Sequence, residues 1–356
     1  MIRSTTNGTL KSYRYNLQRS TYQLNSSRNT VLTGRNFNSF AEDPATATRS
    51  FQLRRSYSKV NSQHAVGQSV VRKYEVAWST LDSVSQDLNT TADDSALTAI
   101  IRGTSDSTAS GRSALGQELR QLAESIVQKM NVKYGDNFVF AGADGLNVPF
   151  NLEDGTLTYR KLDVSTPETD PNNPGTPSAD FVKLDNITQN EKKYVDVGLG
   201  MQENENDELI ESSAFDAALH GTTYLGYGID EDGDSKNVIC ILDRMGEILE
   251  NCDSDGNFAE PTDQAELERL FKKFELATEK FSNKYTELDT RAAFLKSNQS
   301  QLEANSYTLQ EQIVEMEDAD PAEAITAFSW AQYCYNSALK VGNSILSESL
   351  MDYLQT

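Results

Sequence analysis

The chain has 356 residues and a formal charge of −21 at pH 7, with 37% apolar and 24% charged residues. This excess of negative charge argues against a nucleic-acid-binding protein, because phosphates would be repelled by most of the surface. No stretch reaches the roughly 20 apolar residues that span a bilayer, and residues 1–30 lack the apolar run of a cleavable secretory signal. We therefore expect neither a nucleic-acid partner nor a membrane partner.

The first predicted helix covers residues 5–33 and has a heptad pattern. Its apolar stripe is formed by residues seven or three positions apart: Leu10, Tyr13, Leu17, Leu24 and Val31. Small polar residues occupy the alternate positions, so the stripe is too thin for a globular core. Such a helix is predicted to be weak unless it packs against a partner.

Two further helices are predicted at residues 44–90 and 95–134, after which the period of the sequence changes. Segments that alternate, or that are rich in β-branched and aromatic residues, then follow at 137–142, 157–162 and 193–197. We expect a β-rich insert at 143–261. The insert is acidic, because residues 201–268 hold 19 acidic side chains against Lys236 and Arg244.

A long helical seam follows the insert. Its fifteen positions are spaced by threes and fours: Leu267, Leu270, Phe274, Ala277, Phe281, Tyr285, Leu288, Ala292, Leu295, Gln299, Leu302, Ser306, Leu309, Ile313 and Met316. A straight helix of about 50 residues would be about 75 Å long at ~1.5 Å per residue. This length exceeds what a compact domain needs and predicts a rod.

A new helix is predicted to begin at Asp320. The segment Asp320-Pro321-Ala322-Glu323 supplies an N-cap, a proline suited to the first helical position and a glutamate placed for a capping box. The stripe of this last helix again alternates small and large residues, which favours close packing against another helix.

The two ends of the chain carry opposite charge. Residues 1–40 hold six basic side chains and no acid, whereas residues 301–356 hold nine acids and one lysine. Opposite charge and matched thin stripes predict that the first and last helices pack side by side. Exposed ion pairs contribute only about 0–1 kcal/mol each, so charge would select the partner while burial stabilises the pair.

Motifs at both ends resemble one protein family. Gly34-Arg35 at the end of the first helix and Asp43-Pro44-Ala45 at the start of the next are similar to the amino-terminal signature of flagellin-type proteins. Further motifs resemble the hook-associated proteins of the hook to filament junction, the third hook-associated protein family. They comprise Phe140 and Gly142 in Phe-Val-Phe-Ala-Gly, Asp320 at the helix restart, and Tyr353 in the final Ser-Leu-Met-Asp-Tyr-Leu. The resemblance covers about residues 1–142 and 262–356.

Together with the residue patterns, this resemblance implies a mainly α, flagellin-like rod of long paired terminal helices with a β-rich central insert. The expected domains are a terminal coiled coil at 1–43 with 319–356, a helical rod at 44–142 with 262–318, and an acidic outer insert at 143–261.

The resemblance also implies a function and a location. A member of this family would polymerise as a ring at the distal end of the hook, between the first hook-associated protein and flagellin. It would leave the cell through the flagellar type III apparatus, guided by a cytoplasmic export chaperone. No cofactor is implied. The predicted assembly interface consists of Leu10, Tyr13, Leu17, Leu24, Val31, Phe328, Tyr335, Ala338, Leu339, Ile345, Leu346, Leu350 and Leu354.

Catalytic and metal sites are not predicted. The two histidines, His64 and His220, lack a paired ligand spacing, and the three cysteines form no CxxC. The segment 230–234 begins like a calcium loop, but Ile241 stands where a bidentate glutamate should close it. The similar segment at 253–257 fails in the same way.

Other function classes stay open at this point. Flagellin itself shares the helical ends and the Asp-Pro-Ala start. A coiled-coil adaptor that does not polymerise would have similar seams, and a metal-dependent enzyme would have to be carried by residues 201–261.

Overall fold

The computed structural model describes residues 6–37, 39–89, 95–105, 109–153, 155–170, 176–252 and 257–354. The side chains of residues 6–7, 103–105, 109–110 and 345–354 lie outside this description. Contacts divide the chain into two compact units, which we call the end unit (1–61 with 303–356) and the central unit (62–302).

The fold is mainly helical, as the sequence predicts. The long helices are α1 (Thr6–Thr33), α2 (Pro44–Asn89), α4 (Ala109–Met130), α8 (Asp263–Glu317) and α9 (Pro321–Leu354). The helix predicted at 95–134 is divided, because a short α3 (Ala96–Ser105) precedes α4. Within the described residues, none of these helices combines the length and apolar content that crossing a membrane requires.

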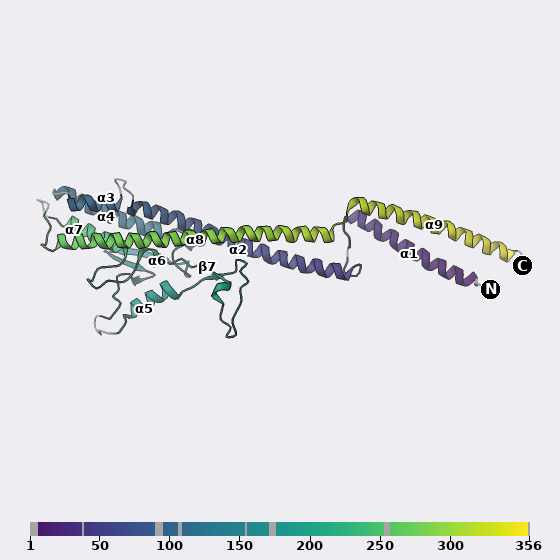
Figure 1. The fold of residues 1–356 in the computed structure, drawn as a ribbon, viewed down its shortest axis with the longest axis horizontal. Helices are drawn as coiled ribbons and strands as arrows, with labels where there is room; N and C mark the ends of the chain where they lie inside the picture. Colours follow the sequence, from purple (N-terminus) through teal and green to yellow (C-terminus); the bar gives the residue numbers. More distant parts are fainter. Residues whose placement is uncertain are drawn as a thin grey trace. The chain divides into compact units, whose positions relative to one another are not determined.

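In the end unit, α1 and α9 lie side by side and run in opposite directions, so both ends of the chain lie at the same end of the pair (Figure 1). The N-terminal part of α2 packs against the C-terminal part of α8 in the same unit. Ser306 Oγ donates to Asn61 Oδ1 at 2.8 Å, which ties these two helices together.

In the central unit, the buried side of α8 is the predicted seam. All fifteen seam positions of α8, including those that continue into the end unit, are buried or half-buried. Trp78 and Asp82 of α2 both contact Tyr285 of α8, through a ring contact at 5.9 Å and a hydrogen bond at 3.2 Å. The spacing of three and four residues between seam positions therefore identifies the packed face of α8 correctly.

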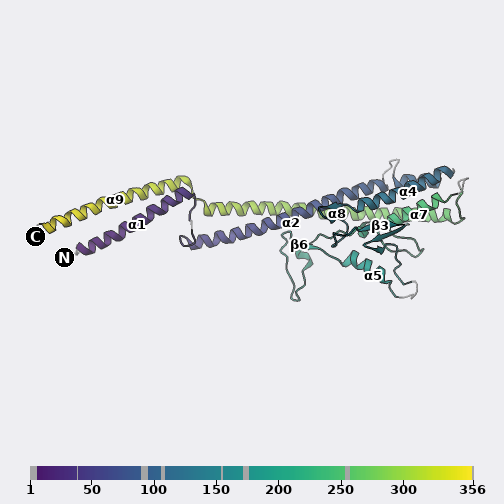
Figure 2. The ribbon, with the colours of Figure 1, turned by 180° about the vertical axis from the view of Figure 1, so that it is seen from behind.

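Among the described residues, the structure has three small antiparallel sheets, two within the predicted insert and one, β1–β2, just before it. They pair β1 (Lys133–Tyr134) with β2 (Asn137–Phe138), β3 (Phe150–Glu153) with β4 (Thr156–Tyr159) and β5 (Leu162–Asp163), and β6 (Tyr194–Val195) with β7 (Phe215–Asp216). Short helices α5 (Ala179–Asp185) and α6 (Gly221–Leu225), a π-helical turn (Asn186–Asn190) and a 3-10 turn (Glu211–Ser213) connect them. Figures 1 and 2 both place strands and α5 along one side of the long helices.

The helices of the insert have no counterpart in the sequence-based expectation, and one of them is longer than the others. It is α7 (Val238–Glu250), which begins where Asn237 Oδ1 accepts hydrogen bonds from the amides of Ile239 and Cys240. The buried amide of Asn237 also donates to the Gly226 carbonyl at 2.8 Å. This residue therefore caps the helix and fixes it to the preceding loop.

Helix α7 packs unusually close to α4 through two glycines. A Cβ atom on Gly116 would lie 2.6 Å from the Gly246 carbonyl oxygen, and one on Gly246 would lie 2.8 Å from the Gly116 carbonyl oxygen. Both obstructions are backbone atoms, which cannot rotate away. The close approach of the two helices therefore requires glycine at both positions.

The limits predicted for the three domains stay a prediction. The boundary between the two compact units lies inside α2 and α8, at 61/62 and 302/303. A continuous helix gives no sequence signal at such a point, because its periodicity continues across the boundary.

Replacing Gly116 with alanine should lower the free energy of unfolding of the central unit by about 1–3 kcal/mol, because α4 and α7 must separate. Thermal and denaturant unfolding followed by circular dichroism would measure this. The exposed Ala114→Ser on the same helix is the matched control and should have little effect. Equal stability of Gly116→Ala and the wild type would contradict the packing described.

Candidate assembly interface

The α1 and α9 helices contact each other along the predicted stripes. On α1, the half-buried residues are Leu10, Tyr13, Leu17, Ser20, Thr21, Leu24, Ser27 and Thr30. On α9, the buried and half-buried residues include Ala324, Phe328, Ala331, Tyr335, Ala338 and Gly342. The prediction that the first and last helices pack together is confirmed.

The register of this pair is fixed by Tyr13 and Gly342. A Cβ atom at position 342 would overlap the Tyr13 ring and hydroxyl, so the glycine provides the space in which the tyrosine lies. Four residues further along each antiparallel helix, Leu17 lies opposite Ala338. Large side chains on α1 therefore meet small ones on α9.

Two predicted interface residues lie outside this seam. Val31 is 37% exposed and Leu339 is 42% exposed. For Val31 the reason is geometric, because a straight α-helix drifts by about 20° per heptad, and three heptads turn the position away from the partner. The side chains of Ile345, Leu346, Leu350, Tyr353 and Leu354 lie beyond those that the structure describes.

The outward faces of the same two helices carry large aromatic side chains. Tyr15 and Tyr22 of α1, and Trp330 and Tyr333 of α9, are each exposed by about two thirds. Trp330 and Tyr333 stack on each other at 5.8 Å between ring centroids. An isolated chain therefore leaves aromatic surface uncovered on both terminal helices.

The connections between helices meet in a joint built on Gly34. This residue follows α1 with a φ of +68°, which favours glycine, and its amide donates to the Thr30 carbonyl at 2.8 Å. Its carbonyl accepts from the Ala319 amide at 2.9 Å, between α8 and α9. Arg35 forms a backbone bridge with Asp318. These signature residues therefore join the α1–α2 connection to the α8–α9 connection.

The same aspartate-proline-alanine device starts both helices that leave the joint. Asp43 Oδ1 accepts from the amides of Ala45 and Thr46 at the start of α2. Asp320 Oδ1 accepts from the Ala322 amide at 2.7 Å at the start of α9. In each case the proline occupies the first helical position, where its missing amide proton has no cost.

Sequence reasoning missed the contact that Glu317, the last residue of α8, makes with α2. Its buried carboxylate accepts hydrogen bonds from Ser50 and Arg54 of α2. The hydrogen bond from Arg54 lowers the pKa of Glu317 to about 2, burial opposes this shift, and Ser50 adds to it. An acidic residue at the end of a heptad pattern carries no signal that distinguishes it from a solvated side chain.

The signature residues of the central unit have structural roles. Phe140 is fully buried, and its carbonyl accepts from the Gly221 amide and the Tyr159 hydroxyl, both at 2.9 Å. Gly142 has a φ of +73°, and a Cβ atom there would overlap the His220 ring. These two positions therefore hold the loop after β2 against α6.

His220 is a buried side chain whose Nε2 lies 2.9 Å from the Glu191 carbonyl oxygen. Because a carbonyl accepts, Nε2 carries the proton, and the buried Nδ1 has no partner among the described residues. Burial lowers the pKa of His220. This environment is that of a neutral packed histidine.

The aspartates at 230, 232 and 234 converge, as a cation loop would require. Their common partner is the Lys273 ammonium, at 2.6 Å from Asp230, 2.9 Å from Asp232 and 2.5 Å from Asp234. Arg269 adds a second pair with Asp234 at 2.7 Å. A side-chain cation thus occupies the centre of this cluster. Asp253 and Asp255 lie outside the described residues.

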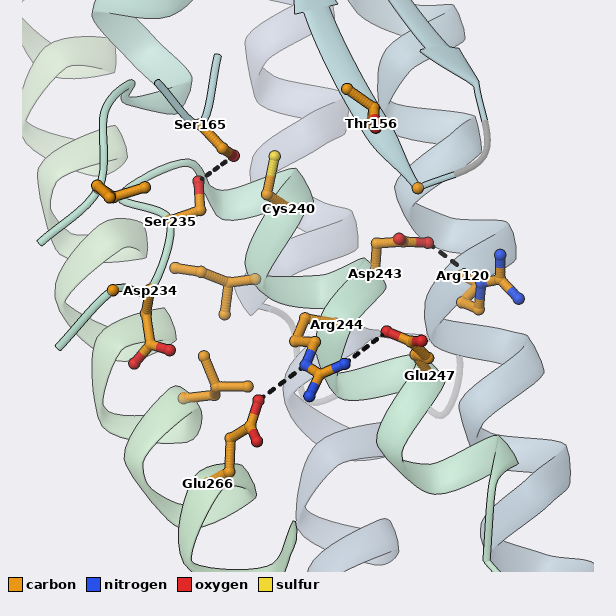
Figure 3. Close-up of a pocket in the computed structure, with 15 residues that line it drawn as sticks. Arg120, Thr156, Ser165, Asp234, Ser235, Cys240, Asp243, Arg244, Glu247 and Glu266 are labelled. Atoms are coloured by element: carbon orange, nitrogen blue, oxygen red, sulfur yellow. Dashed lines mark hydrogen bonds and ion pairs between the residues drawn. The ribbon is translucent and has the colours of Figure 1, made fainter. Parts of the chain in front are cut away.

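The central unit also has a hollow of about 600 Å³ beside α7, and its charged side chains pair with one another (Figure 3). Arg120 binds Asp243 at 3.1 Å, while Arg244 binds Glu247 at 2.8 Å and Glu266 at 2.7 Å. Burial raises the pKa of the Cys240 thiol, which makes it a poor nucleophile. The arrangement suits ion pairs that link helices better than catalysis.

No family model matches the chain, and no curated protein matches it in sequence. Among solved structures, it is similar to a protein from Vibrio parahaemolyticus provisionally described as a flagellar hook-associated protein, with 18% identity and a TM-score of 0.56 over 78% of this chain and 100% of that one. The resemblance predicted from the motifs is therefore confirmed at the level of the fold.

Two further solved structures give lower scores. Bacillus cereus FlgL has 18% identity and a TM-score of 0.45, over 74% of this chain and 99% of that one. Flagellar hook-associated protein 3 from Legionella pneumophila has 12% identity and a TM-score of 0.45, over 74% of this chain and 99% of that one.

Replacing Glu317 with glutamine should lower the free energy of unfolding of the end unit by about 1–2 kcal/mol at pH 7, because Arg54 loses its ion pair and is itself half exposed to screening solvent. In the wild type, this contribution should be complete above pH 4.5 and decrease as the pH falls toward 2, because folding lowers the pKa from 4.5 to about 2.

Chemical denaturation of the two proteins between pH 7 and pH 2 would measure the difference. The exposed Glu311→Gln, on the same helix, is the control. A difference between wild type and Glu317→Gln that does not decrease with acid would contradict the role of the ionised carboxylate.

Proposed function

We propose that this chain is a structural subunit of the bacterial flagellum, polymerising at the junction between hook and filament. The observation that carries the proposal is the α1–α9 pair, whose seam buries few large side chains and whose outward aromatic faces are exposed. A pair of this kind gains stability when neighbouring subunits cover those faces. The fold shared with the Vibrio protein supports the flagellar setting.

The predicted interface residues belong to this proposal. Leu10, Tyr13, Leu17 and Leu24 would hold α1 on α9 within one chain, while Val31 and Leu339 point away from the seam and would contact neighbours. The terminal coiled coil (1–43 with 319–356) would form the inner layer, and the acidic insert (143–261) would face outward. The signature motifs favour a subunit of the hook to filament junction over a flagellin subunit of the filament itself.

The proposed partners are further copies of the chain, the first hook-associated protein on the hook side and flagellin on the filament side. The chain would be exported through the flagellar type III apparatus with a cytoplasmic chaperone and would act without a cofactor. The described ion pairs around α7 and Lys273 support a structural role over a catalytic one.

Removing residues 330–356 should abolish assembly and motility while leaving the central unit folded, because α9 would lose most of its seam. Motility in soft agar and electron microscopy of purified flagella would measure the loss, and circular dichroism of the truncated protein would check folding. Normal flagella from the truncated chain would overturn the proposal.

Gold labelling of an epitope-tagged chain in purified flagella would locate it. A single band at the distal end of the hook is expected. Label along the whole filament would identify a flagellin instead, and a defined small oligomer that never joins flagella would identify an adaptor.

A further inference from the structure

The central unit has an apolar groove of about 450 Å³ that none of the interactions above uses. Val66 and Val70 of α2, Phe138 of β2 and Val195 of β6 supply its apolar walls. Val66 is 43% exposed and lies at the open edge of the groove. The floor of the groove is formed by buried side chains that continue into the core, such as Val70 and Val139, while Val66 at its edge stays exposed.

Two lysines line the same groove. Lys73 Nζ donates to the Ala217 carbonyl at 2.9 Å. Burial is the main cause that lowers the pKa of Lys73 to about 8, and the nearby charge of Lys193 adds to this effect. Lys193 is exposed and forms no ion pair with any described residue. Asp136 at the rim and Asp216 nearby are the acidic groups that face this pair. The groove thus has a positively charged side that an anionic partner would suit.

A protruding segment of the same unit has the complementary chemistry. We call residues 201–211 the acidic hairpin; it contains Glu203, Glu205 and Asp207, whose side chains are exposed and form no ion pair in the described part of the chain. Met201 and Ile210 at its base are 40% and 37% exposed. The hairpin therefore offers carboxylates next to apolar side chains.

The acidic hairpin is internally ordered. The Asn204 amide donates to the Glu208 carbonyl at 2.7 Å, and Asn204 Oδ1 accepts from the amides of Asn206 and Glu208. The Ile210 amide donates to the Gln202 carbonyl at 2.9 Å. A preformed hairpin loses little conformational entropy when it binds.

We propose that the acidic hairpin of one copy docks into the lysine-lined groove of a neighbouring copy. Because one surface binds a different surface on its neighbour, this contact is heterologous and can be repeated from subunit to subunit around a ring or helix. The inference rests on the proposed function, since it needs copies brought side by side. The proposed docking would give the insert a contact between neighbouring copies, in addition to the contacts that the terminal helices α1 and α9 would make.

Charge reversal tests the contact directly. Lys193→Glu alone and Glu205→Lys with Asp207→Lys should each weaken self-association of the full-length protein by about three- to tenfold, through like-charge repulsion. The two changes combined in one chain should restore most of the association, because the pair is recreated with its charges exchanged. Analytical ultracentrifugation at increasing protein concentration would measure each constant.

Matched controls separate this contact from a general effect of charge. Lys272→Glu and Glu124→Lys reverse exposed charges elsewhere on the central unit and should leave the association constant unchanged. Unfolding midpoints of all variants should match that of the wild type, because neither Lys193 nor the carboxylates of Glu205 and Asp207 support the fold.

A second measurement distinguishes docking between copies from closure within one copy. In a background in which the free Cys240, Cys252 and Cys334 are replaced by serine, protein carrying Lys193→Cys is mixed with protein carrying Asp207→Cys under oxidation. The mixture should give a crosslinked heterodimer in greater yield than either protein gives alone. Crosslinking that occurs only when both cysteines are in one chain would overturn the proposal. A combined charge-reversal variant that self-associates no more strongly than the separate variants would overturn it as well.

These experiments distinguish a failure of the hairpin contact from a failure of the proposed function. If truncation of residues 330–356 abolishes assembly but the charge reversals change nothing, only the hairpin contact is wrong. If the wild-type chain does not self-associate at any concentration, the hairpin contact is wrong, and the truncation and gold-labelling experiments still decide the proposed function.

Discussion

The limited apolar area that α1 and α9 bury against each other constrains the rest of the end unit. No residue of α1 is fully buried among those whose side chains are described, and small residues such as Ala331 and Gly342 occupy the facing positions on α9. Close approach compensates in part, since Tyr13 lies directly over Gly342. The pair is consequently specific in register but modest in stability, which suits helices that are completed by neighbours.

The joint between the helices adds stability that the α1–α9 seam lacks, because it determines where α1 and α8 end and where α2 and α9 begin. Gly34 and Ala319 connect the two chain reversals through a backbone hydrogen bond, and Glu317 holds α2 through Arg54. Asp43 and Asp320 then start the outgoing helices with the same cap. Most of these contacts are polar and local to the joint, so the geometry there does not depend on a large hydrophobic core.

The sequence predicts what is encoded locally. The stripes of α1, α8 and α9 follow from periodicity, and the starts of α2 and α9 follow from Asp43-Pro44 and Asp320-Pro321, because caps and periods involve neighbours in the chain. It could not predict contacts between distant residues: Glu317 binds a partner 263 positions away, and Gly116 is required only because Gly246 faces it. Helix α7 is a different case, because its buried residues Val238, Ile241, Leu242, Met245 and Leu249 are spaced by threes and fours. This amphipathic pattern is local to the sequence and was overlooked.

The lysine within the three-aspartate cluster has a consequence for how the insert responds to its surroundings. Loops of this kind in other proteins take their shape from a bound divalent ion and lose it when the ion is removed. Here Lys273 brings the positive charge on α8 itself, covalently attached and always present. We therefore expect the loop at 230–234 to keep its conformation in calcium-free media and in the presence of chelators. Because Lys273 and Asp234 are mostly buried, added salt should screen this cluster less than it screens exposed ion pairs.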